Sequence, residues 1–512
     1  GGKFDGTFED FFTATDADGI RTFPVAPNRP IYQAFYIQDK FTFRDIIFRL
    51  GLRVDRYDAN TKVLKDNYSL YEIMGAGEFH DRFGGDRPGN IGDDFKVYTA
   101  GAGSDNVQAY RAGDQWYLPN GTPVNNVALA IPSGVVTPKY QDARIDDNIN
   151  FIRARDFDPN VSFKDYEVQT NFMPRLAFSF PISEDANFFA HYDVLVQRPP
   201  TNTIATALDY FYFFDRSGIR NNPNLKPERT IDYEVGFKQK LTNASALTIT
   251  AYYKEMRDMI SSRIFFPVPI INQYETYDNL DFGTVKGFSF VFDQRRSGNF
   301  SMNANYTLQF ADGTGSDANS QRAISSRGVL RTLFPLNFDE RHRLVLSADY
   351  RYDSGKRYTG PRLFGMDIFA DAGVNFQAIA VSGRPYTRKF LPTELGGEGT
   401  IGAINGARNP WNFTINLRVD KSFNIGDKMS VNVYCRVSNL LDRRNIIGVY
   451  PATGSATDDG FIRSAFGQNQ ITSVQNSLRE VDAYLASYQW ALLNPGNFSL
   501  PRRIFVGAIF DF

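Results

Sequence analysis

The sequence has few of the residues that build disulfides and metal sites. Its 512 residues include one cysteine and three histidines. The single Cys435 excludes an internal disulfide and a cysteine-based metal cluster. The histidines His80, His191 and His342 lie far apart in the chain, so only the fold could bring them together. We therefore predict no metal site and no cofactor.

Long apolar runs, strong net charge and enzyme motifs are also missing. The sequence contains no stretch of about 18 consecutive apolar residues, so it predicts no transmembrane helix. The formal net charge is -1 and no basic run occurs, which argues against a nucleic-acid partner. The sequence contains no G-x-S-x-G, no phosphate-binding G-x-x-x-x-G-K-[ST] and no H-E-x-x-H. We predict no catalytic residues and a protein that is not an enzyme.

Aromatic residues are plentiful. They make up 15% of the chain, with 46 Phe and 27 Tyr, although the mean hydropathy is only -0.35. Many aromatics, a low mean hydropathy and no apolar helix describe a transmembrane β-barrel as well as a soluble all-β protein. The pattern along the chain has to separate these two classes.

Strict alternation of apolar and polar residues recurs from one end of the chain to the other. In 411–423, "WNFTINLRVDKSF", every second residue is apolar and the residues between are mostly polar. The ranges 298–312 and 46–55 repeat this pattern. Strands of soluble sandwiches average about five or six residues. The longer alternation suits tilted strands that cross a bilayer, with one face toward lipid.

The alternation and the turn residues between the runs predict thirteen strands. They lie near 31–41, 43–57, 167–182, 187–198, 230–241, 245–261, 281–296, 298–312, 339–353, 369–384, 411–424, 428–442 and 502–512. Short connections, such as 183–186 and 242–244, alternate with long ones, such as 58–166 and 443–501. Short turns at one rim and long loops at the other are typical of outer-membrane barrels.

The predicted strand count is odd, whereas bacterial single-chain barrels have even numbers of strands. The first strand is expected to run inward from an external segment, and the last strand also ends on the inner side. An open sheet edge in lipid would leave backbone groups without hydrogen bonds. We therefore expect further strands upstream of Gly1.

Several stretches resemble the TonB-dependent outer-membrane receptors. "NPNLKPERTIDYEVGFKQ", 222–239, is similar to the family motif that leads from an external loop into a barrel strand. The ranges 34–58, 339–352 and 382–387 and the terminal "AIFDF" resemble the same family. The resemblance implies a 22-stranded barrel with an N-terminal plug and a TonB box. Residues 1–512 would then be the C-terminal portion of one transmembrane β-barrel domain, supplying strands ten to twenty-two, without the plug and the early strands.

The resemblance also implies a function and partners. It points to active transport across the outer membrane of a Gram-negative bacterium, with a metal chelate, an oligosaccharide or a peptide as the nutrient. The implied partners are outer-membrane lipid, TonB, the barrel-assembly machinery and a surface lipoprotein. One alternative is a non-transporting barrel with a structural or secretion-associated role. A second alternative, a soluble adhesin-like sandwich, fits the long alternation poorly.

The alternation of residues within each strand assigns charged side chains to the lumen and aromatic ones to the lipid face. The charged candidates for the lumen are Arg49, Arg53, Asp232, Glu234, Lys238, Asp349, Arg351, Arg418, Asp420 and Arg436. The resemblance implies that such residues mostly pack against the plug. Tyr253, Tyr306, Tyr350, Tyr352 and Trp411 are expected in the lipid-facing band.

The external loops are the expected place for recognition, because binding residues concentrate on loops held by a rigid scaffold. In 208–217 five aromatics follow one another: Tyr210, Phe211, Tyr212, Phe213 and Phe214. They could pack on neighbouring loops or the outer leaflet, or form a platform for a ligand or a partner protein. The long external loop 58–166 could form a small subdomain over the pore.

The chain ends on an aromatic residue within an alternating strand. Phe510 and Phe512 lie on the apolar face of 502–512. This ending resembles the signal that the barrel-assembly machinery reads. The last strand must also pair with the first one to leave no free edge in the bilayer.

Overall fold

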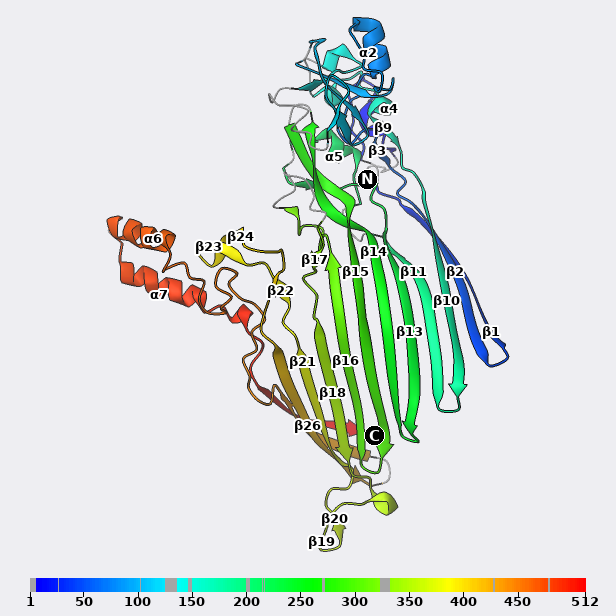
Figure 1. Cartoon of the computed structure of the whole chain (residues 1–512), viewed down its shortest axis with the longest axis vertical. Helices are drawn as coiled ribbons and strands as arrows, with labels where there is room; N and C mark the ends of the chain where they lie inside the picture. The colour runs from blue at the N-terminus through cyan, green and yellow to red at the C-terminus, as the bar shows by residue number, and fades with distance from the viewer. Residues whose placement is uncertain are drawn as a thin grey trace.

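Thirteen long strands form one antiparallel sheet in the order of the chain (Figure 1). The computed structural model describes residues 6–512 except 26, 102, 125–135, 146–149, 199–202, 214, 216, 269–271, 323–331, 427–428 and 478. The long strands are β1 (Ile31–Phe43), β2 (Ile46–Asp58), β10 (Gln169–Ser183), β11 (Ala186–Gln197), β13 (Glu228–Thr242), β14 (Ser245–Val268), β15 (Asn272–Ser297), β16 (Phe300–Gly313), β18 (His342–Arg351), β21 (Ala372–Val381), β26 (Asn412–Ile425), β27 (Met429–Ser438) and β28 (Arg503–Asp511).

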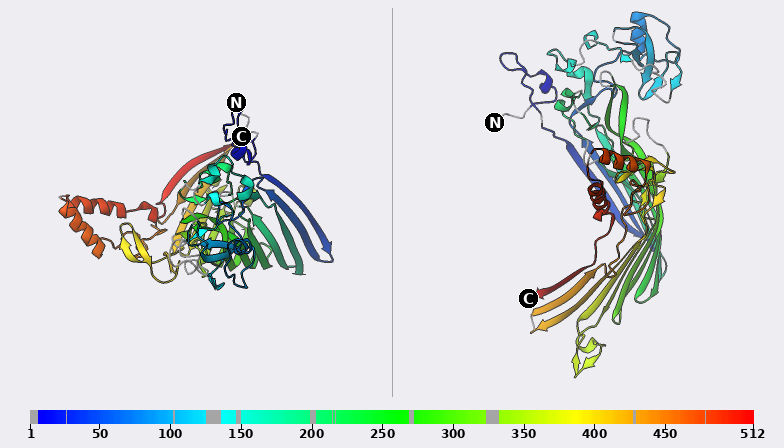
Figure 2. Two further views of the ribbon diagram at one scale, coloured as in Figure 1. Left: turned by 90° about the horizontal axis from the view of Figure 1, so that it is seen from above. Right: turned by 90° about the vertical axis from the view of Figure 1, so that its left-hand side faces the viewer.

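The sheet is curved into a barrel wall. Seen from above, its strands follow an arc that ends at β1 on one side and β28 on the other (Figure 2). Within the described residues each of these two edge strands pairs with only one neighbour. All residues of β1 are exposed. The prediction of an all-β antiparallel barrel fold with thirteen strands is confirmed.

The register gives the sheet one apolar and one polar face. Tyr306 lies opposite Leu344, and Ala378 lies opposite Ile415, so apolar side chains align across neighbouring strands. The residues between them, such as Asn416 beside Gln377, are polar on the other face. Because successive side chains in a strand point to opposite faces, the local alternation becomes two continuous surfaces.

The two rims of the sheet differ in their connections. One rim has tight turns such as 44–45, 184–185 and 298–299. The other rim has long segments, including 59–168 between β2 and β10, and 439–502 between β27 and β28. This alternation of short turns and long loops follows the sequence prediction.

The segment 59–168, which we call the cap, lies above the long-loop rim (Figure 1) and shares its main hydrophobic core with residues from outside the segment, among them Phe11, Tyr210 and Tyr274. Its sheet has the order β7-β6-β5-β4-β8, and β3 pairs with β9. The elements are β3 (Lys62–Leu64), α2 (Ala76–Phe83), β4 (Lys96–Thr99), β5 (Val107–Ala112), β6 (Gln115–Tyr117), β7 (Pro123–Val124), β8 (Thr137–Pro138), α4 (Pro159–Ser162) and β9 (Phe163–Asp165). Buried aromatics such as Tyr98 and Trp116 fill its core.

Arg263 joins the cap to the strands below it. Its guanidinium lies 2.9 Å from Asp114 of the cap and 2.7 Å from Asp278 on β15. The Phe265 ring stacks on Tyr274 and makes an edge contact with Tyr68 of the cap. β14 and β15 reach the cap because they have 24 and 26 residues, which is longer than the sequence predicted. The sequence prediction ended β14 at 261, where Ser261, Ser262 and Arg263 interrupt the alternation of apolar and polar residues.

The other described α-helices and short strands lie in the connections, except α1, which precedes β1. They are α1 (Asp10–Thr13), α5 (Ala207–Phe211), β12 (Ile219–Arg220), β17 (Phe334–Pro335), β19 (Arg362–Leu363), β20 (Met366–Asp367), β22 (Pro385–Tyr386), β23 (Lys389–Thr393), β24 (Gly396–Thr400), β25 (Ala407–Arg408), α6 (Ala465–Asn476) and α7 (Val481–Leu492). The helices α6 and α7 project sideways at the long-loop rim (Figure 1). Among the described residues, no helix combines the length and apolar character needed to cross a membrane.

Candidate functional site

The aromatic segment 210–214 begins on a short helix beneath the cap. Thr206 and Asp209 form a reciprocal capping box that starts α5, with the Thr206 amide donating to Asp209 at 2.7 Å. The helix orients Tyr210, and the turn that follows orients Phe213. Phe214 lies outside the described residues.

Most of this segment packs on neighbouring loops. Tyr210 and Phe213 are buried, and their rings lie 4.9 Å from Phe163 and Tyr274 respectively, measured between ring centroids. Phe211 packs against Phe11. Tyr212 is the exception, with 42% of its surface exposed. The packing reflects the cost of leaving adjacent aromatic rings in water.

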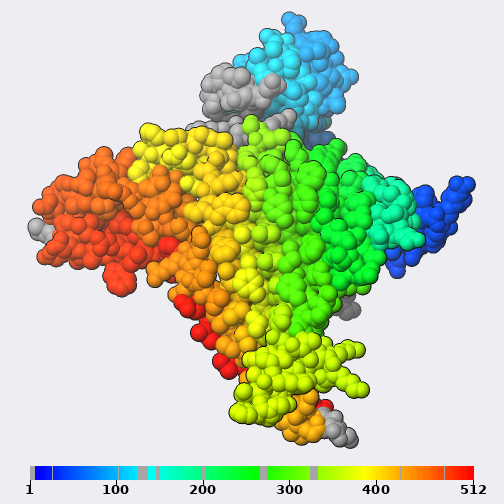
Figure 3. Space-filling model, turned by 60° about the horizontal axis from the view of Figure 1, so that its bottom comes forward, coloured from blue at the N-terminus to red at the C-terminus, as the bar shows by residue number. Residues whose placement is uncertain are grey.

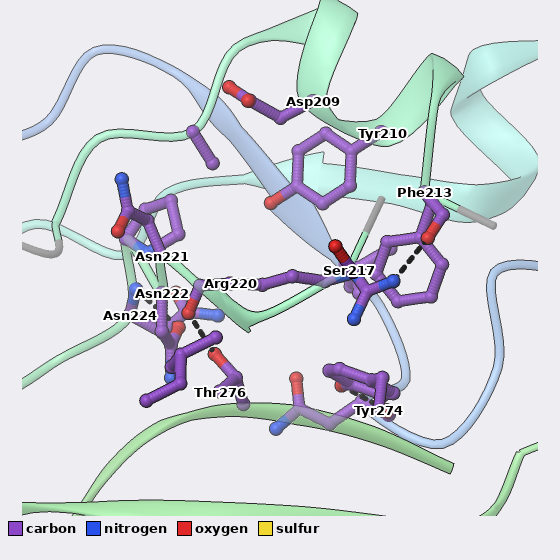
Figure 4. A pocket seen from close by; sticks show the side chains of 15 residues that line it. Asp209, Tyr210, Phe213, Ser217, Arg220, Asn221, Asn222, Asn224, Tyr274 and Thr276 are labelled. Atoms are coloured by element: carbon purple, nitrogen blue, oxygen red, sulfur yellow. Dashed lines mark hydrogen bonds between the residues drawn. The ribbon is translucent and has the colours of Figure 1, made fainter. Parts of the chain in front are cut away.

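The buried side of the segment lines a pocket of about 170 Å³ (Figure 4). The pocket lies between α5, the loop that leads into β13, and β15. The Arg220 guanidinium lies over the Phe213 ring, 4.6 Å from its centroid, and also near the Tyr274 ring at 5.5 Å. Thr276 holds the Arg220 backbone by donating its hydroxyl to the carbonyl at 2.8 Å. These contacts fix the cation between two aromatic faces.

The Tyr210 hydroxyl points into the pocket (Figure 4) and has no hydrogen-bond partner among the described residues. Only 6% of Tyr210 is exposed. Burial raises the pKa of this phenol well above its ordinary value, so the group stays neutral and can donate or accept. A hydroxyl that lines a pocket can form a hydrogen bond with a ligand atom or a water.

The neighbouring amides serve mainly to hold the pocket wall. Asn222 donates to the Tyr277 carbonyl at 2.9 Å, and Asn221 donates to the Ile204 carbonyl at the same distance. The pocket therefore offers aromatic faces, the hydroxyls of Tyr210 and Ser217 and the Arg220 cation, and Asp209 also belongs to its lining. This set suits a ring-bearing ligand with a hydroxyl or anionic group. The family-like motif 222–239 forms one edge of the pocket and continues into β13.

The ten charged residues assigned to the lumen share one face of the sheet. The register connects Arg49 through Ala177 and His191 to Glu234, and connects Asp349 through Asn375 to Arg418. The complete set is Arg49, Arg53, Asp232, Glu234, Lys238, Asp349, Arg351, Arg418, Asp420 and Arg436. Their contact with a plug stays a prediction.

Ion pairs between strands organise this polar face, and one of them reaches across the intervening strand β21. Arg351 on β18 makes a two-pronged contact with Asp420 on β26, at 2.9 and 2.8 Å. Asn432 on β27 donates to the same carboxylate at 3.0 Å. Lys254, which the sequence did not single out, lies 2.8 Å from Asp232. Lys254 is an even number of residues from Thr248 and Thr250, which places it on the same face of β14. The adjacent tyrosines 252 and 253 obscured this alternation in the sequence.

One group on this face has the residue types of a metal site. Ligand atoms of His191, Asp232 and Glu234 lie within 4.8 Å of one another. However, the Lys254 ammonium already lies against Asp232, and the His191 ring lies 3.0 Å from Glu234. The Lys254–Asp232 ion pair and the His191–Glu234 contact account for the arrangement. His80 and His342 lie elsewhere: His80 contacts Tyr110 in the cap, and His342 stacks on Trp411.

Among the residues that the structure describes, the C-terminal strand β28 pairs with β27 alone. Phe510 lies opposite Val431 on the apolar face and is 67% exposed, while Phe512 is fully exposed. Their exposure follows from the open edge beside β28. Their role in barrel assembly stays a prediction.

The match to a protein-family model agrees with this architecture. Residues 2–440 match the family model described as TonB dependent receptor-like, beta-barrel. No curated protein matches the chain. A solved structure with a similar fold is the closed form of the ferric-catecholate import receptor Fiu from E. coli K12, with a TM-score of 0.41 and 15% identity. The similarity covers 83% of this chain and 42% of the Fiu chain.

Two further solved structures are similar at the level of the fold. The ferric yersiniabactin uptake receptor FyuA from Yersinia pestis has a TM-score of 0.39 and 12% identity, over 83% of this chain and 43% of its own. The FrpB iron transporter from Neisseria meningitidis has a TM-score of 0.41 and 11% identity, over 86% and 46%. The chain thus spans less than half the length of these proteins.

Proposed function

Because the chain belongs to the TonB-dependent receptor-like β-barrel family, we propose that it forms part of a nutrient importer in a Gram-negative outer membrane. The observation behind this proposal is the curved sheet with one apolar face and one polar, ion-paired face. An apolar outer face fits lipid, and a polar inner face fits a lumen occupied by a plug and a solute. TonB is the proposed source of energy.

The open sheet supports the proposal that more of the barrel exists. The backbone groups along the free edges of β1 and β28 would find no hydrogen bonds in lipid. We propose that further strands cover these edges and that a plug occupies the lumen of a barrel of about 22 strands. The barrel-assembly machinery is the proposed reader of Phe510 and Phe512. A surface lipoprotein is a further proposed partner at the loop rim.

We place recognition of the nutrient at the pocket lined by Tyr210, Phe213 and Arg220. The pocket opens beneath the cap at the long-loop rim, where an external solute would arrive. Its aromatic rings, the Tyr210 hydroxyl and the Arg220 cation suit a solute with a ring and a polar or anionic group, such as a catecholate chelate or a sugar acid. The protein has no proposed enzymatic activity.

Uptake in whole cells tests the transport proposal. The probes are an iron-55 catecholate chelate, a labelled oligosaccharide and a labelled peptide. We expect one probe to accumulate only when both the complete gene and TonB are present. Loss of the gene that changes no uptake but alters secretion or envelope composition would instead support the structural or secretion-associated role.

A matched pair of tyrosine variants tests the pocket. Tyr210→Phe removes only the hydroxyl that points into the pocket, and Tyr212→Phe removes an exposed hydroxyl outside it. Loss of one hydrogen bond to the solute costs about 1 kcal/mol. We expect Tyr210→Phe to weaken binding about fivefold, by that relation. Equal affinity in both variants would remove the pocket from recognition.

A further inference from the structure

The connection between β18 and β21 departs from the other turns at its rim. Residues 352–371 replace the tight turn that joins other strand pairs there, such as 298–299. The connection contains the hairpin β19–β20, which extends beyond the lower ends of the strands (Figure 1). In the space-filling view the same yellow-green segment stands out at the lower end of the molecule (Figure 3).

The tip of this hairpin has an unfavourable backbone for its sequence. Phe364 has φ of 48° and Gly365 has φ of 79°. Two-residue hairpin turns with positive φ at both positions favour Asn, Asp or Gly at the first position. A bulky aromatic residue rarely adopts this conformation, because its Cβ crowds the backbone. Turn formation therefore gives no reason for a phenylalanine at 364.

Exposure adds a second penalty at the same residue. Phe364 is 92% exposed, and its neighbours Met366 and Leu363 are 63% and 52% exposed. Three apolar side chains thus surround the turn without cover in the described structure. Strain and exposure together indicate that the tip contacts another apolar phase.

The apolar tip is connected to the apolar face of the sheet. Tyr350 lies on that face of β18 and is 43% exposed. Its ring contacts Tyr352 at 5.3 Å, and Tyr352 stacks on Phe369 at 6.0 Å, measured between centroids. The Phe369 amide donates to the Tyr358 hydroxyl, which braces the base of the hairpin. Aromatic side chains thus lead from the lipid-facing surface to the hairpin.

The charges at the base of the hairpin fit a phospholipid surface. Lys356 and Arg357 are exposed, and no acidic partner faces either residue within the described structure. Asp353 pairs with Arg296, and Asp367 pairs with Arg362. Cations beside an aromatic and aliphatic tip are the arrangement of segments that lie in a membrane interface.

We propose that the hairpin 362–367 inserts into the phospholipid leaflet at the turn rim and anchors the barrel wall there. Phe364, Met366 and Leu363 enter the leaflet, while Lys356 and Arg357 contact phosphate groups. The strained turn is retained because it directs Phe364 away from the protein and into lipid. This inference depends on the membrane-spanning fold and not on the transported solute.

Site-specific fluorescence tests the insertion. The complete protein with Cys435→Ala is given a single new cysteine, Phe364→Cys, labelled with an environment-sensitive fluorophore. It is reconstituted into vesicles of phosphatidylethanolamine and phosphatidylglycerol. The control is Glu184→Cys in the tight, exposed turn 184–185. We expect spin-labelled lipid to quench the label at 364 several-fold more strongly than the control, and iodide to quench it less.

A second variant separates backbone strain from lipid contact. Phe364→Asn suits the positive φ and should leave folding intact. With the label at Met366→Cys, we expect this variant to lose most of the quenching by lipid. Equal iodide access at 364 and 184 would overturn the proposal. Protection of 364 that requires an added periplasmic protein would also overturn it and would identify a protein contact.

Discussion

Arg111 provides a test of what stabilises the cap. It is 3% exposed, and it donates to the Tyr98 hydroxyl at 3.0 Å, to the Gly113 carbonyl at 2.8 Å and to Asp66. Its guanidinium also lies over the Tyr68 ring, 4.3 Å from the centroid. Arg111→Leu keeps much of the apolar volume but leaves Asp66 and the Tyr98 hydroxyl without their cation.

The magnitude follows from burial. Breaking a buried ion pair by removing one partner costs about 3–5 kcal/mol. Each 1.4 kcal/mol is tenfold in an equilibrium constant, so local opening of the cap should become roughly 10²- to 4 × 10³-fold more frequent. Arg87, whose ion pair with Asp93 is mostly exposed, is the matched control. Arg87→Leu should cost at most about 1 kcal/mol.

Hydrogen exchange in the detergent-solubilised protein measures this opening directly. We expect amides of β4, β5 and β6 to exchange much faster in Arg111→Leu, with β13 and β16 unchanged as an internal reference. Arg111→Lys, which keeps the charge but loses the planar fork, should give an intermediate rate. If Arg111→Leu and Arg87→Leu exchange alike, the buried cation does not hold the cap together.

Three further predictions concern the barrel wall and the cap. A Cβ at Gly287 would lie 2.2 Å from the backbone oxygen of Leu308, so Gly287→Ala should lower the free energy of unfolding by about 1–3 kcal/mol. The control Gly51→Ala, whose Cβ would meet no atom closer than 3.7 Å, should be tolerated. Heat-modifiability assays compare the two variants. Asp420→Ala should cost about 3–5 kcal/mol of stability because it leaves the Arg351 guanidinium without its carboxylate partner. Asp349 is half-buried and lies 3.9 Å from the same guanidinium, so Asp349→Ala should cost at most about 1 kcal/mol. Equal melting temperatures of the two variants would contradict this. Burial raises the pKa of Tyr68 and Tyr71 from 10 to about 12. The unfolded cap therefore loses these protons first, so its stability is full below pH 10 and falls by about 3 kcal/mol per tyrosine as the pH rises through 12; exchange rates in β4–β6 that stay constant over this interval would contradict it.

The sequence by itself determined the strands and their faces. Alternation with period two is a local property, so 411–423 already showed that Phe413 and Ile415 share a face opposite Thr414 and Asn416. The short turns could also be predicted from adjacent residues, because a turn of two residues reverses the chain by its own local conformation. Charged residues could therefore be assigned to one face before any pairing was known.

Only the tertiary structure decided which residues meet. Arg351 and Asp349 are two residues apart, yet Arg351 bonds to Asp420, which lies 69 residues away. That choice depends on the register of three strands, which no local pattern specifies. The same holds for Tyr210 and Tyr274, which approach each other only because the long strands β14 and β15 extend beyond the sheet to meet the loops.

The sequence did not predict the structure of the segments that connect the strands. The helix α7 is apolar around most of its circumference, so it shows no clean helical stripe. The hairpin tip at Phe364 contradicts the usual turn residues, and its backbone conformation becomes visible only in three dimensions. Local alternation sets faces because it acts between neighbours in sequence. Register, loop packing and the pocket depend on contacts between distant segments, which only the folded chain brings together.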